Sequence, residues 1–319
     1  LLKFAKILGK ENVRNGFYGQ DDNLTFYNLC RINMFLHDIN FDDFDIAYGD
    51  TLLAPKHWDD EPFEAIVSNP PYSQPWPGKG NPLLINDPRY APAGVLAPTS
   101  KSDFAFDILM LDDWKTPKYI EASGTAAIVC FPGIMYRSGA EKKIRQYLVD
   151  SNYVDAVIQL PENLFFGTTI ATCIMVLKKS KADTQTVFID ASKECVKVTN
   201  SNKLTPENIE NILKLYTDRV DVAHTVRVAK GAEIAAEDYN FSVSTYVAPE
   251  DTREIIDITQ LNAELREIVA REAVLRTEID RIVAEESQAV DHALARVRAM
   301  SPKATLERGY AIIADSDNA

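Results

Sequence analysis

The sequence predicts an α/β protein with a doubly wound, mostly parallel sheet, followed by a C-terminal helical extension. Three observations support this fold class. Short apolar runs typical of buried strands alternate with amphipathic helical segments over residues 1–180. Acidic or amide residues follow three of these runs directly, at the sheet edge where ligands bind in folds of this kind. From residue 252 onward the pattern changes to a long charged helix with an apolar seam.

The first part of the chain contains three expected strands, each with a polar residue at or just after its end. An amphipathic helix over residues 1–8 comes first, and Gly9 is a suitable stop for it. The strands are expected at residues 16–21, 44–50 and 63–68. Regularly spaced apolar residues predict a helix between the first two strands, at residues 24–37.

The middle of the chain alternates in the same way after one interruption. Residues 78–102 are rich in Pro, Gly and Asn and predict a long surface loop. Helices are then expected at residues 103–111 and 141–149, and strands at 125–131, 155–160 and 172–177. From about residue 181 the alternation stops, and a helix at 206–216 and a mixed segment up to 240–244 follow.

These changes of pattern predict four parts: a catalytic domain at residues 1–180, a C-terminal subdomain at 181–250, a long helix at 251–287 and a tail at 288–319. The long helix has a heptad seam of apolar residues that Glu272 interrupts. The seam consists of Ile258, Leu261, Leu265, Ile268, Leu275, Ile279 and Ile282. It predicts packing against other helices, although short heptad runs also arise by chance in solvated terminal helices.

Composition narrows the classes of function. The chain has 319 residues and a net charge of −13, which argues against a freestanding nucleic-acid binder. A DNA enzyme whose duplex contacts come mainly from a partner remains compatible with that charge. The apolar runs are too short to span a bilayer, and no signal peptide is recognisable. Four scattered cysteines and no His/Cys cluster predict a cytoplasmic protein with reduced thiols and without a metal site or membrane association.

Asn69-Pro70-Pro71-Tyr72 is the most specific chemical signal. The exocyclic amine of a nucleobase is a poor nucleophile because its lone pair is delocalised into the ring. The Asn69 side-chain oxygen and the Pro70 carbonyl can both accept hydrogen bonds from such an amine, which directs the lone pair at a methyl donor. The prolines fix the turn without competing N–H groups, and Tyr72 can stack on a base flipped out of a duplex. A plain Pro-Pro turn is the alternative, but the position after an apolar strand favours the chemical interpretation.

Two acidic residues end the first two expected strands. Asp21 can accept both ribose hydroxyls of a nucleoside cofactor, but it also stands in a run of residues suited to capping a helix. Asp50 can accept from an adenine amino group, or it can simply form a polar turn. The local sequence leaves both alternatives open.

The order of these three sites, together with longer segments, resembles the modification subunits of type I restriction–modification systems. Asn-Pro-Pro-Tyr is the catalytic motif of amino-methyltransferases that act on DNA adenine. The resemblance covers roughly residues 1–285, and its segments are residues 27–38, 86–90, 102–106, 124–132, 159–165 and 239–244. It implies a Rossmann-like, S-adenosylmethionine-dependent methyltransferase fold and an activity that methylates N6 of adenine in duplex DNA.

Residue by residue, the resemblance implies that the target adenine is held by Asn69, Pro70, Pro71 and Tyr72. It implies that Asp21 binds the ribose and Asp50 the adenine of S-adenosylmethionine. It further implies that Asp103 and Phe104 line the same pocket. The partners that it implies are duplex DNA, a specificity subunit, a second modification subunit and the restriction subunit, which is a translocase and endonuclease.

Two departures from the family concern the ends of the chain. The family's Gly-rich S-adenosylmethionine loop, which follows its first strand, is not found, and Leu1 corresponds to a position just after it. We therefore expect a natural start upstream, a sheet that lacks its first strand, and no methyl transfer by residues 1–319 alone. Residues 299–312 resemble the C-terminal segment of the exonuclease VII large subunit, which would make the chain a composite.

A catalytically inactive fragment, or an assembly module whose fold only scaffolds a restriction complex, is the alternative from another class. The paired amine acceptors at Asn69 and Pro70 favour an enzyme, because a scaffold does not need them. Methylation of cytosine N4 or of a protein amide uses similar motifs, and the family segments favour adenine.

Overall fold

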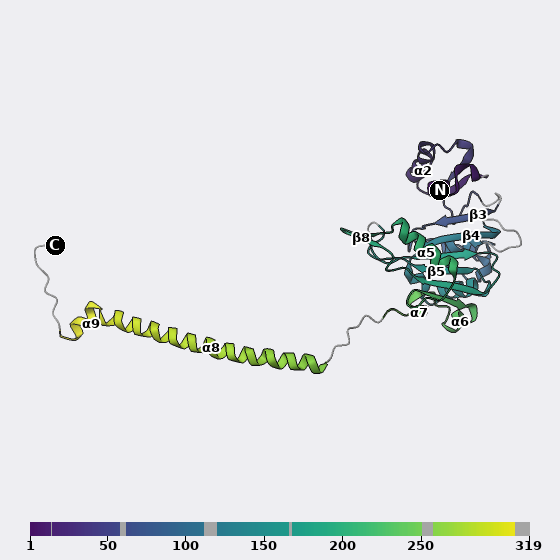
Figure 1. The fold of residues 1–319 in the computed structure, drawn as a ribbon. Helices are drawn as coiled ribbons and strands as arrows, with labels where there is room; N and C mark the ends of the chain where they lie inside the picture. Colours follow the sequence, from purple (N-terminus) through teal and green to yellow (C-terminus); the bar gives the residue numbers. More distant parts are fainter. Residues whose placement is uncertain (14, 58–61, 112–119, 166–167, 251–257, 310–319) are drawn as a thin grey trace, which may run out of the picture. The chain divides into compact units, whose positions relative to one another are not determined.

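The computed structural model describes residues 1–13, 15–57, 62–111, 120–165, 168–250 and 258–309. Contacts between residues divide the chain into two compact units, residues 1–250 and residues 251–319. Within the described residues, the strands all belong to the first unit and the second unit is helical (Figure 1).

The strands form one mixed sheet of six strands and two smaller pairs. Their bounds are β1 (Phe17–Asp21), β2 (Phe44–Tyr48), β3 (Phe63–Ser68), β4 (Ile120–Cys130), β5 (Val154–Gln159), β6 (Cys173–Lys178), β7 (Gln185–Asp190), β8 (Val196–Val198), β9 (Ser201–Lys203) and β10 (Val226–Lys230). The large sheet has the order β10-β7-β5-β6-β4-β3, in which β3 is parallel to β4 and β5 to β7. β1 and β2 form a separate parallel pair, and β8 and β9 form an antiparallel hairpin.

Two of the longer helices begin at side-chain caps. The α-helices are α1 (Leu2–Leu8), α2 (Leu24–Leu36), α3 (Asp103–Leu111), α4 (Ala140–Asp150), α5 (Pro206–Asp218), α6 (Gly231–Ala236), α7 (Val243–Tyr246), α8 (Ile258–Ala299) and α9 (Pro302–Glu307). Short 3-10 helices are η1 (Lys10–Asn12), η2 (Phe41–Asp43), η3 (Gly78–Gly80), η4 (Leu84–Asn86), η5 (Ala91–Ala93) and η6 (Pro132–Met135). The Asn23 side chain caps α2, and Thr205 and Asn208 form a reciprocal capping box on α5.

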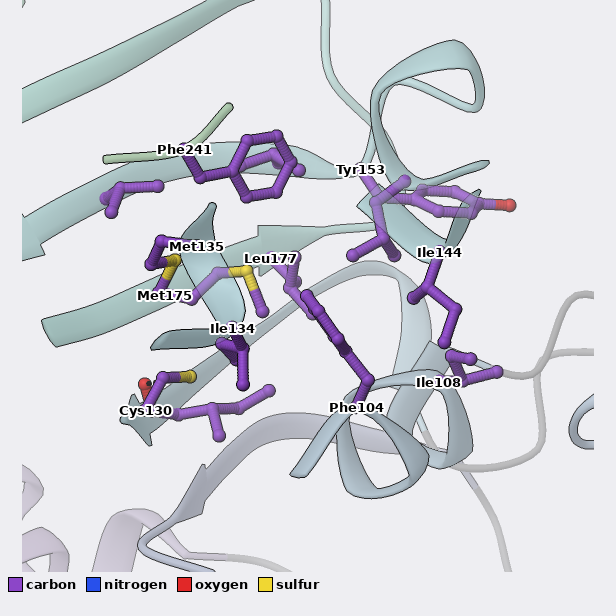
Figure 2. Packing of buried hydrophobic residues seen from close by; sticks show 14 of the residues in the cluster. Phe104, Ile108, Cys130, Ile134, Met135, Ile144, Tyr153, Met175, Leu177 and Phe241 are labelled. Atoms are coloured by element: carbon purple, nitrogen blue, oxygen red, sulfur yellow. Dashed lines mark hydrogen bonds between the residues drawn. The ribbon is translucent and has the colours of Figure 1, made fainter. Parts of the chain in front are cut away.

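Both faces of the large sheet are buried. One face packs against Phe104 and Ile108 of α3, Ile144 of α4 and Phe241, which gather around Met175 and Leu177 of β6 (Figure 2). The other face packs against Ile212 of α5. Neighbouring β7 residues, Val187 and Phe188, belong to these two different clusters, as the alternation of side chains along a strand requires. Burial on both faces explains why β5 and β7 are nearly continuous apolar runs.

The α/β fold class predicted from the sequence is confirmed, but the sheet is mixed. β6 lies between β4 and β5 and runs antiparallel to both, and β10 runs antiparallel to β7. The expected strands and helices of residues 1–180 are present with ends shifted by a few residues. β4 is longer, since it begins at Ile120 where residue 125 was expected.

The expected separate subdomain at residues 181–250 was wrong. β7 and β10, which the sequence did not predict, extend the large sheet beyond β5. Phe188, Ala229 and Phe241 belong to the same core cluster as the residues of α3 and α4. The apolar run from Thr186 to Ile189 was the available signal, and the cross-strand pairing that makes it part of the sheet is not visible in the local sequence.

The expectation of a surface loop at residues 78–102 was also wrong. This segment lacks regular strands and contains η3, η4 and η5, but several of its apolar side chains are buried, although Leu83 and Ile85 are exposed. Leu84 is 4% exposed, and Tyr90 and Leu96 are each 1% exposed. Proline and glycine therefore make the backbone irregular here, while part of the segment still contributes to the core.

The second unit consists mainly of α8, a helix of 42 residues whose seam residues from Ile258 to Ile282 are all exposed. The expected boundary at residue 287 falls inside this helix, which continues to Ala299. After Ile282 the apolar stripe shifts by one position and continues through Val283, Val290, Leu294 and Val297. Residues 251–257 of the expected helix and residues 310–319 of the expected tail lie outside the described residues.

Two further sequence expectations can be compared with the described residues. Cys30, Cys130, Cys173 and Cys195 are all free thiols, and Cys130 and Cys173 are buried in the sheet. None of the described helices combines the length and the apolar character needed to cross a bilayer.

Candidate active site

The three sequence-predicted polar sites lie around one cavity of about 1330 Å³. Asp21 is the last residue of β1, Asp50 follows β2, and Asn69 follows β3. All three line the cavity, together with Pro70 and Pro71. The tertiary structure therefore brings together residues that are up to 48 positions apart, counting from 21 to 69.

The cavity separates the β1–β2 pair from β3. Residues of β1 line one side and residues of β3 line the other. Within the described residues, neither strand has a strand neighbour on this side. The Tyr18 ring on β1 and the Phe63 ring at the start of β3 are in contact, with 5.1 Å between their centroids. The two sheets thus touch at the beginning of β3, and Asn69 follows its other end.

The Asn69–Tyr72 turn holds its own side chains in place. The Tyr72 hydroxyl donates to Oδ1 of Asn69 at 2.9 Å. Pro70 is buried and Asn69 is exposed at the cavity, so the amide is accessible while its turn is anchored. Burial raises the pKa of Tyr72, which keeps the hydroxyl protonated and able to donate.

An aromatic neighbour of Tyr72 was not predicted from the sequence. The ring of Phe131, directly after β4, lies 6.4 Å from the Tyr72 ring at an angle of 45°. The Arg137 guanidinium lies over the Phe131 ring, 5.2 Å from its centroid. The signal that could have found Phe131 is its place at the carboxyl end of a strand parallel to β3.

Arg145 anchors the segment that carries Phe131, and nothing in the sequence pointed to it. This side chain is 1% exposed and donates to the carbonyl oxygens of Ile134, Arg137 and Tyr239 at 2.6–2.7 Å. Burial lowers the pKa of Arg145 to about 10, so the group stays charged at neutral pH. One buried cation therefore joins η6 to the segment before α7.

Asp103 supports the loop after Tyr72. Both of its carboxylate oxygens accept from the backbone N–H of Ser73 at 3.2 Å, and Ser73 has a left-handed φ of 50°. Asp103 is 5% exposed and Phe104 is 1% exposed, and neither is among the cavity-lining residues. The structure therefore does not place them in the pocket that the family resemblance implied for them. Phe104 instead fills the core, as Figure 2 shows, because its position on α3 faces the sheet.

The two strand-end aspartates each use one oxygen in a local turn. Oδ1 of Asp21 accepts from the N–H of Asn23 at 2.8 Å, and Asn23, not Asp21, is the cap of α2. Oδ1 of Asp50 accepts from the N–H groups of Leu52 and Leu53 at 2.8 and 3.1 Å. The structure records no partner for either Oδ2 atom among the described residues. The turn role and a ligand role are thus compatible for both carboxylates.

Comparison with known proteins places this geometry in a family. Residues 1–255 match the family model described as N-6 DNA Methylase. The chain is 44% identical over 293 residues to the type I restriction enzyme MpnII methylase subunit of Mycoplasma pneumoniae, covering 89% of this chain and 53% of that protein. It is 33% identical over 274 residues to the MjaVII methylase subunit of Methanocaldococcus jannaschii, covering 82% of this chain and 46% of that protein.

A solved structure agrees with these sequence relatives. The type I restriction–modification methyltransferase subunit of Streptococcus thermophilus superimposes with a TM-score of 0.71 at 36% identity. The match covers 77% of this chain and 51% of that one. The chain thus spans about half the length of the relatives that it matches.

Proposed function

The chain belongs to the N-6 DNA methylase family, and on that premise we propose that it acts as the modification subunit of a type I restriction–modification complex. The proposed reaction transfers a methyl group from S-adenosylmethionine to N6 of adenine in duplex DNA. The observation that carries the proposal is the Asn69 amide, oriented by Tyr72 and exposed to the same cavity as Asp21 and Asp50.

Asn69 and Pro70 provide the acceptors that the target amine needs. Oδ1 of Asn69 and the carbonyl oxygen of Pro70 each accept one N–H of the adenine amino group, so that its lone pair turns out of the ring plane. The Tyr72 hydroxyl donates to Oδ1 of Asn69 and so fixes the rotation of the amide, and Oδ1 keeps a second lone pair that can accept from the target amine. No carboxylate base is required, because the amine proton becomes acidic only as the new N–C bond forms.

The rings of Tyr72 and Phe131 suit an extrahelical base. An enzyme that modifies a base nitrogen takes the base out of the duplex and stacks it on aromatic side chains. The two rings are 6.4 Å apart and inclined to each other, beside the amide that would bind the amine. This neighbourhood supports a nucleobase over a protein amide as the substrate.

The cavity residues fit a nucleoside cofactor. The Oδ2 atoms of Asp21 and Asp50, for which the described structure records no partner, are suited to ribose hydroxyls and to an adenine amino group respectively. S-adenosylmethionine, when bound, supplies the electrophilic methyl group. Asp21 and Asp50 would orient it from one side of the cavity while Asn69 orients the amine from another.

The exposed seam of α8 supports assembly with other chains. A helix with seven seam residues exposed, all apolar, would gain stability by packing against helices of a partner. We propose the specificity subunit as that partner, and a second modification subunit and the restriction subunit as further members of the complex. Sequence recognition would then belong to the specificity subunit.

Replacement of Asn69 tests the proposed reaction. In a chain restored at its N-terminus, Asn69→Ala should lower methyl transfer by a factor on the order of 100 or more, as the loss of one transition-state hydrogen-bonding group does elsewhere. Transfer is measured with labelled S-adenosylmethionine and duplex DNA in the presence of a specificity subunit. Binding of the cofactor should stay unchanged, because Asn69 acts on the target amine. Asn211→Ala, exposed on α5, is the matched control and should leave both quantities unchanged.

Two outcomes would contradict the proposal. Near-normal turnover by Asn69→Ala would remove Asn69 from the catalytic role. An assembled complex of the restored chain, with Asn69 unaltered, that binds DNA but never transfers a methyl group would favour the scaffold alternative.

A further inference from the structure

The β8–β9 hairpin projects from the same sheet edge as Asn69. β3, β4, β5 and β7 all run in one direction, because β6 is antiparallel to both β4 and β5. Their carboxyl ends therefore share one edge. Asn69 follows β3 at this edge, and the hairpin follows β7.

Two hydrogen bonds anchor the hairpin to that edge. The backbone N–H of Asn202 donates to the carbonyl oxygen of Asn163 at 2.9 Å, and its side-chain Nδ2 donates to the carbonyl oxygen of Glu162 at 2.8 Å. Both carbonyls belong to the loop after β5, which leaves the sheet at the same edge. The hairpin thus has a defined position relative to the sheet.

The hairpin is basic in an acidic chain. Its eight residues, 196–203, include Lys197 and Lys203 and no acidic residue, whereas the whole chain has a net charge of −13. Both lysines are exposed, and the structure records no ion pair for either within the residues that it describes. Lys193, just before the hairpin, differs because it binds Glu250 at 2.7 Å.

The register places the two lysines on opposite faces of the hairpin. Lys203 pairs with Val196, and Lys197 pairs with Asn202. Directly paired residues share a face and neighbouring residues alternate, so Lys197 and Lys203 point away from each other. A two-stranded ribbon fits the major groove of B-DNA, where it has a phosphate backbone on each side.

From these observations we propose that the β8–β9 hairpin binds duplex DNA in its major groove, with Lys197 and Lys203 contacting the phosphates of the two opposite strands. The proposal rests on the proposed function, since it takes a duplex with its target base at Asn69. Four strand spacings separate β3 from β7, about 19 Å. At about 3.4 Å per base pair, the contact lies five or six base pairs from the target base.

The alternative binding partner of the hairpin is a protein surface, because two of its valines are exposed. Val196 and Val198 are 49% and 46% exposed, and both lie on the face of Lys203. Two half-exposed valines form a small patch, and a protein contact would not account for a lysine on each face. The charge pattern therefore favours DNA.

The salt dependence of DNA binding tests the hairpin. Fluorescence anisotropy with a short labelled duplex gives the dissociation constant of the chain, in complex with a specificity subunit, at several salt concentrations. Each phosphate contact contributes about 0.9 to the slope of log affinity against log salt. The double variant Lys197→Ala/Lys203→Ala should therefore reduce that slope by about 1.8. Between roughly 50 and 200 mM salt, the unaltered chain should lose about twelvefold more affinity than the variant.

Matched variants make the result specific. Lys230→Ala removes an exposed lysine at the end of β10, which is antiparallel to β7, so that this residue lies at the opposite sheet edge. It should leave the slope unchanged. The conservative variant Lys197→Arg/Lys203→Arg should restore the slope, and circular dichroism should show that all variants are folded.

The outcomes separate this proposal from the proposed function. An unchanged slope in the double alanine variant, or no binding of the duplex at the lowest salt by the complex that contains the unaltered chain, would overturn the hairpin proposal. Loss of co-purification with a specificity subunit at an unchanged slope would identify a protein contact instead. If Asn69→Ala keeps full turnover while the hairpin variants lose the slope, the proposed reaction fails and the DNA contact stands.

Discussion

Asp107 is a buried carboxyl group whose protonation should make the stability of the protein depend on pH. It lies on α3, one helical turn after Asp103, and is 1% exposed. Neither of its carboxylate oxygens has a hydrogen-bond partner among the described residues. Burial, and then repulsion from Asp103, raise the pKa of Asp107 well above its ordinary value of 3.8. The folded protein therefore keeps a proton that the unfolded chain releases.

The sign and size of the effect follow from linkage. A carboxyl group whose pKa is raised in the folded state makes its full contribution to stability at pH values below the pKa that it has in the unfolded chain. That contribution is lost as the pH rises toward the folded pKa, at about 1.4 kcal/mol per pH unit. Asp107→Asn has nearly the same shape and cannot ionise. The free energy of unfolding of the variant, minus that of the unaltered chain, should therefore rise by about 1.4 kcal/mol per pH unit above about pH 4.

Urea unfolding at a series of pH values measures this difference. The fluorescence of Trp76 can report unfolding, because Trp76 belongs to the same core cluster as Phe104. Asn211→Ala, exposed on α5, is the control and should give no pH-dependent difference from the unaltered chain, because neither side chain ionises. A difference for Asp107→Asn that stays flat with pH would refute the reasoning, since it would mean that Asp107 has the same charge in the folded and unfolded states.

The remaining predictions concern the sheet, the helical extension and the cofactor. Arg219→Ala removes one of the two cations paired with Asp155, which is 2% exposed and keeps Lys178, and should lower the free energy of unfolding by about 2 kcal/mol in urea titrations. Arg227→Ala, in an exposed ion pair, should lower it by less than about 1 kcal/mol, and equal effects would contradict this explanation. Deletion of residues 252–319 should prevent co-purification with a specificity subunit while the circular dichroism of the sheet persists; an undiminished complex would exclude α8 as the essential docking element. Residues 1–319 alone should bind S-adenosylmethionine weakly or not at all in isothermal titration calorimetry, because among the described residues the cavity edges of β1 and β3 have no strand neighbours and the family's Gly-rich loop is not found in residues 1–319; tight stoichiometric binding would disprove this.

Local patterns predicted the elements around the candidate site well. The strands that end at Asp21 and Ser68, and the helix Asp103–Leu111, have the expected ends or differ by one residue, because apolar runs bounded by polar residues are short-range signals. The same patterns failed for β7 and β10. Those strands are defined by pairing with β5 and with each other, which no local pattern reports.

The candidate site shows the same limit. The motif Asn69–Tyr72 could be identified from residue types and from its position after a strand. Its orienting hydrogen bond and its neighbour Phe131 could not, because they depend on the placement of β4 beside β3. For Asp50, the polar-turn reading and the ligand reading were alternatives in the sequence. The structure shows the turn and leaves the ligand role a prediction that is compatible with it, since only one of the carboxylate oxygens has a recorded role in the turn.

The sequence by itself determined the α/β class, the family, and the residue types that can accept a nucleobase amine, because these depend on local periodicity and on short motifs. Only the tertiary structure decided that β6 runs antiparallel between β4 and β5 and that Phe104 fills the core. It also decided that Asp21, Asp50 and Asn69 share one cavity. The reason is physical: strand pairing and burial are set by contacts between residues far apart in the chain, where one hydrophobic side chain can pack equally well against many others.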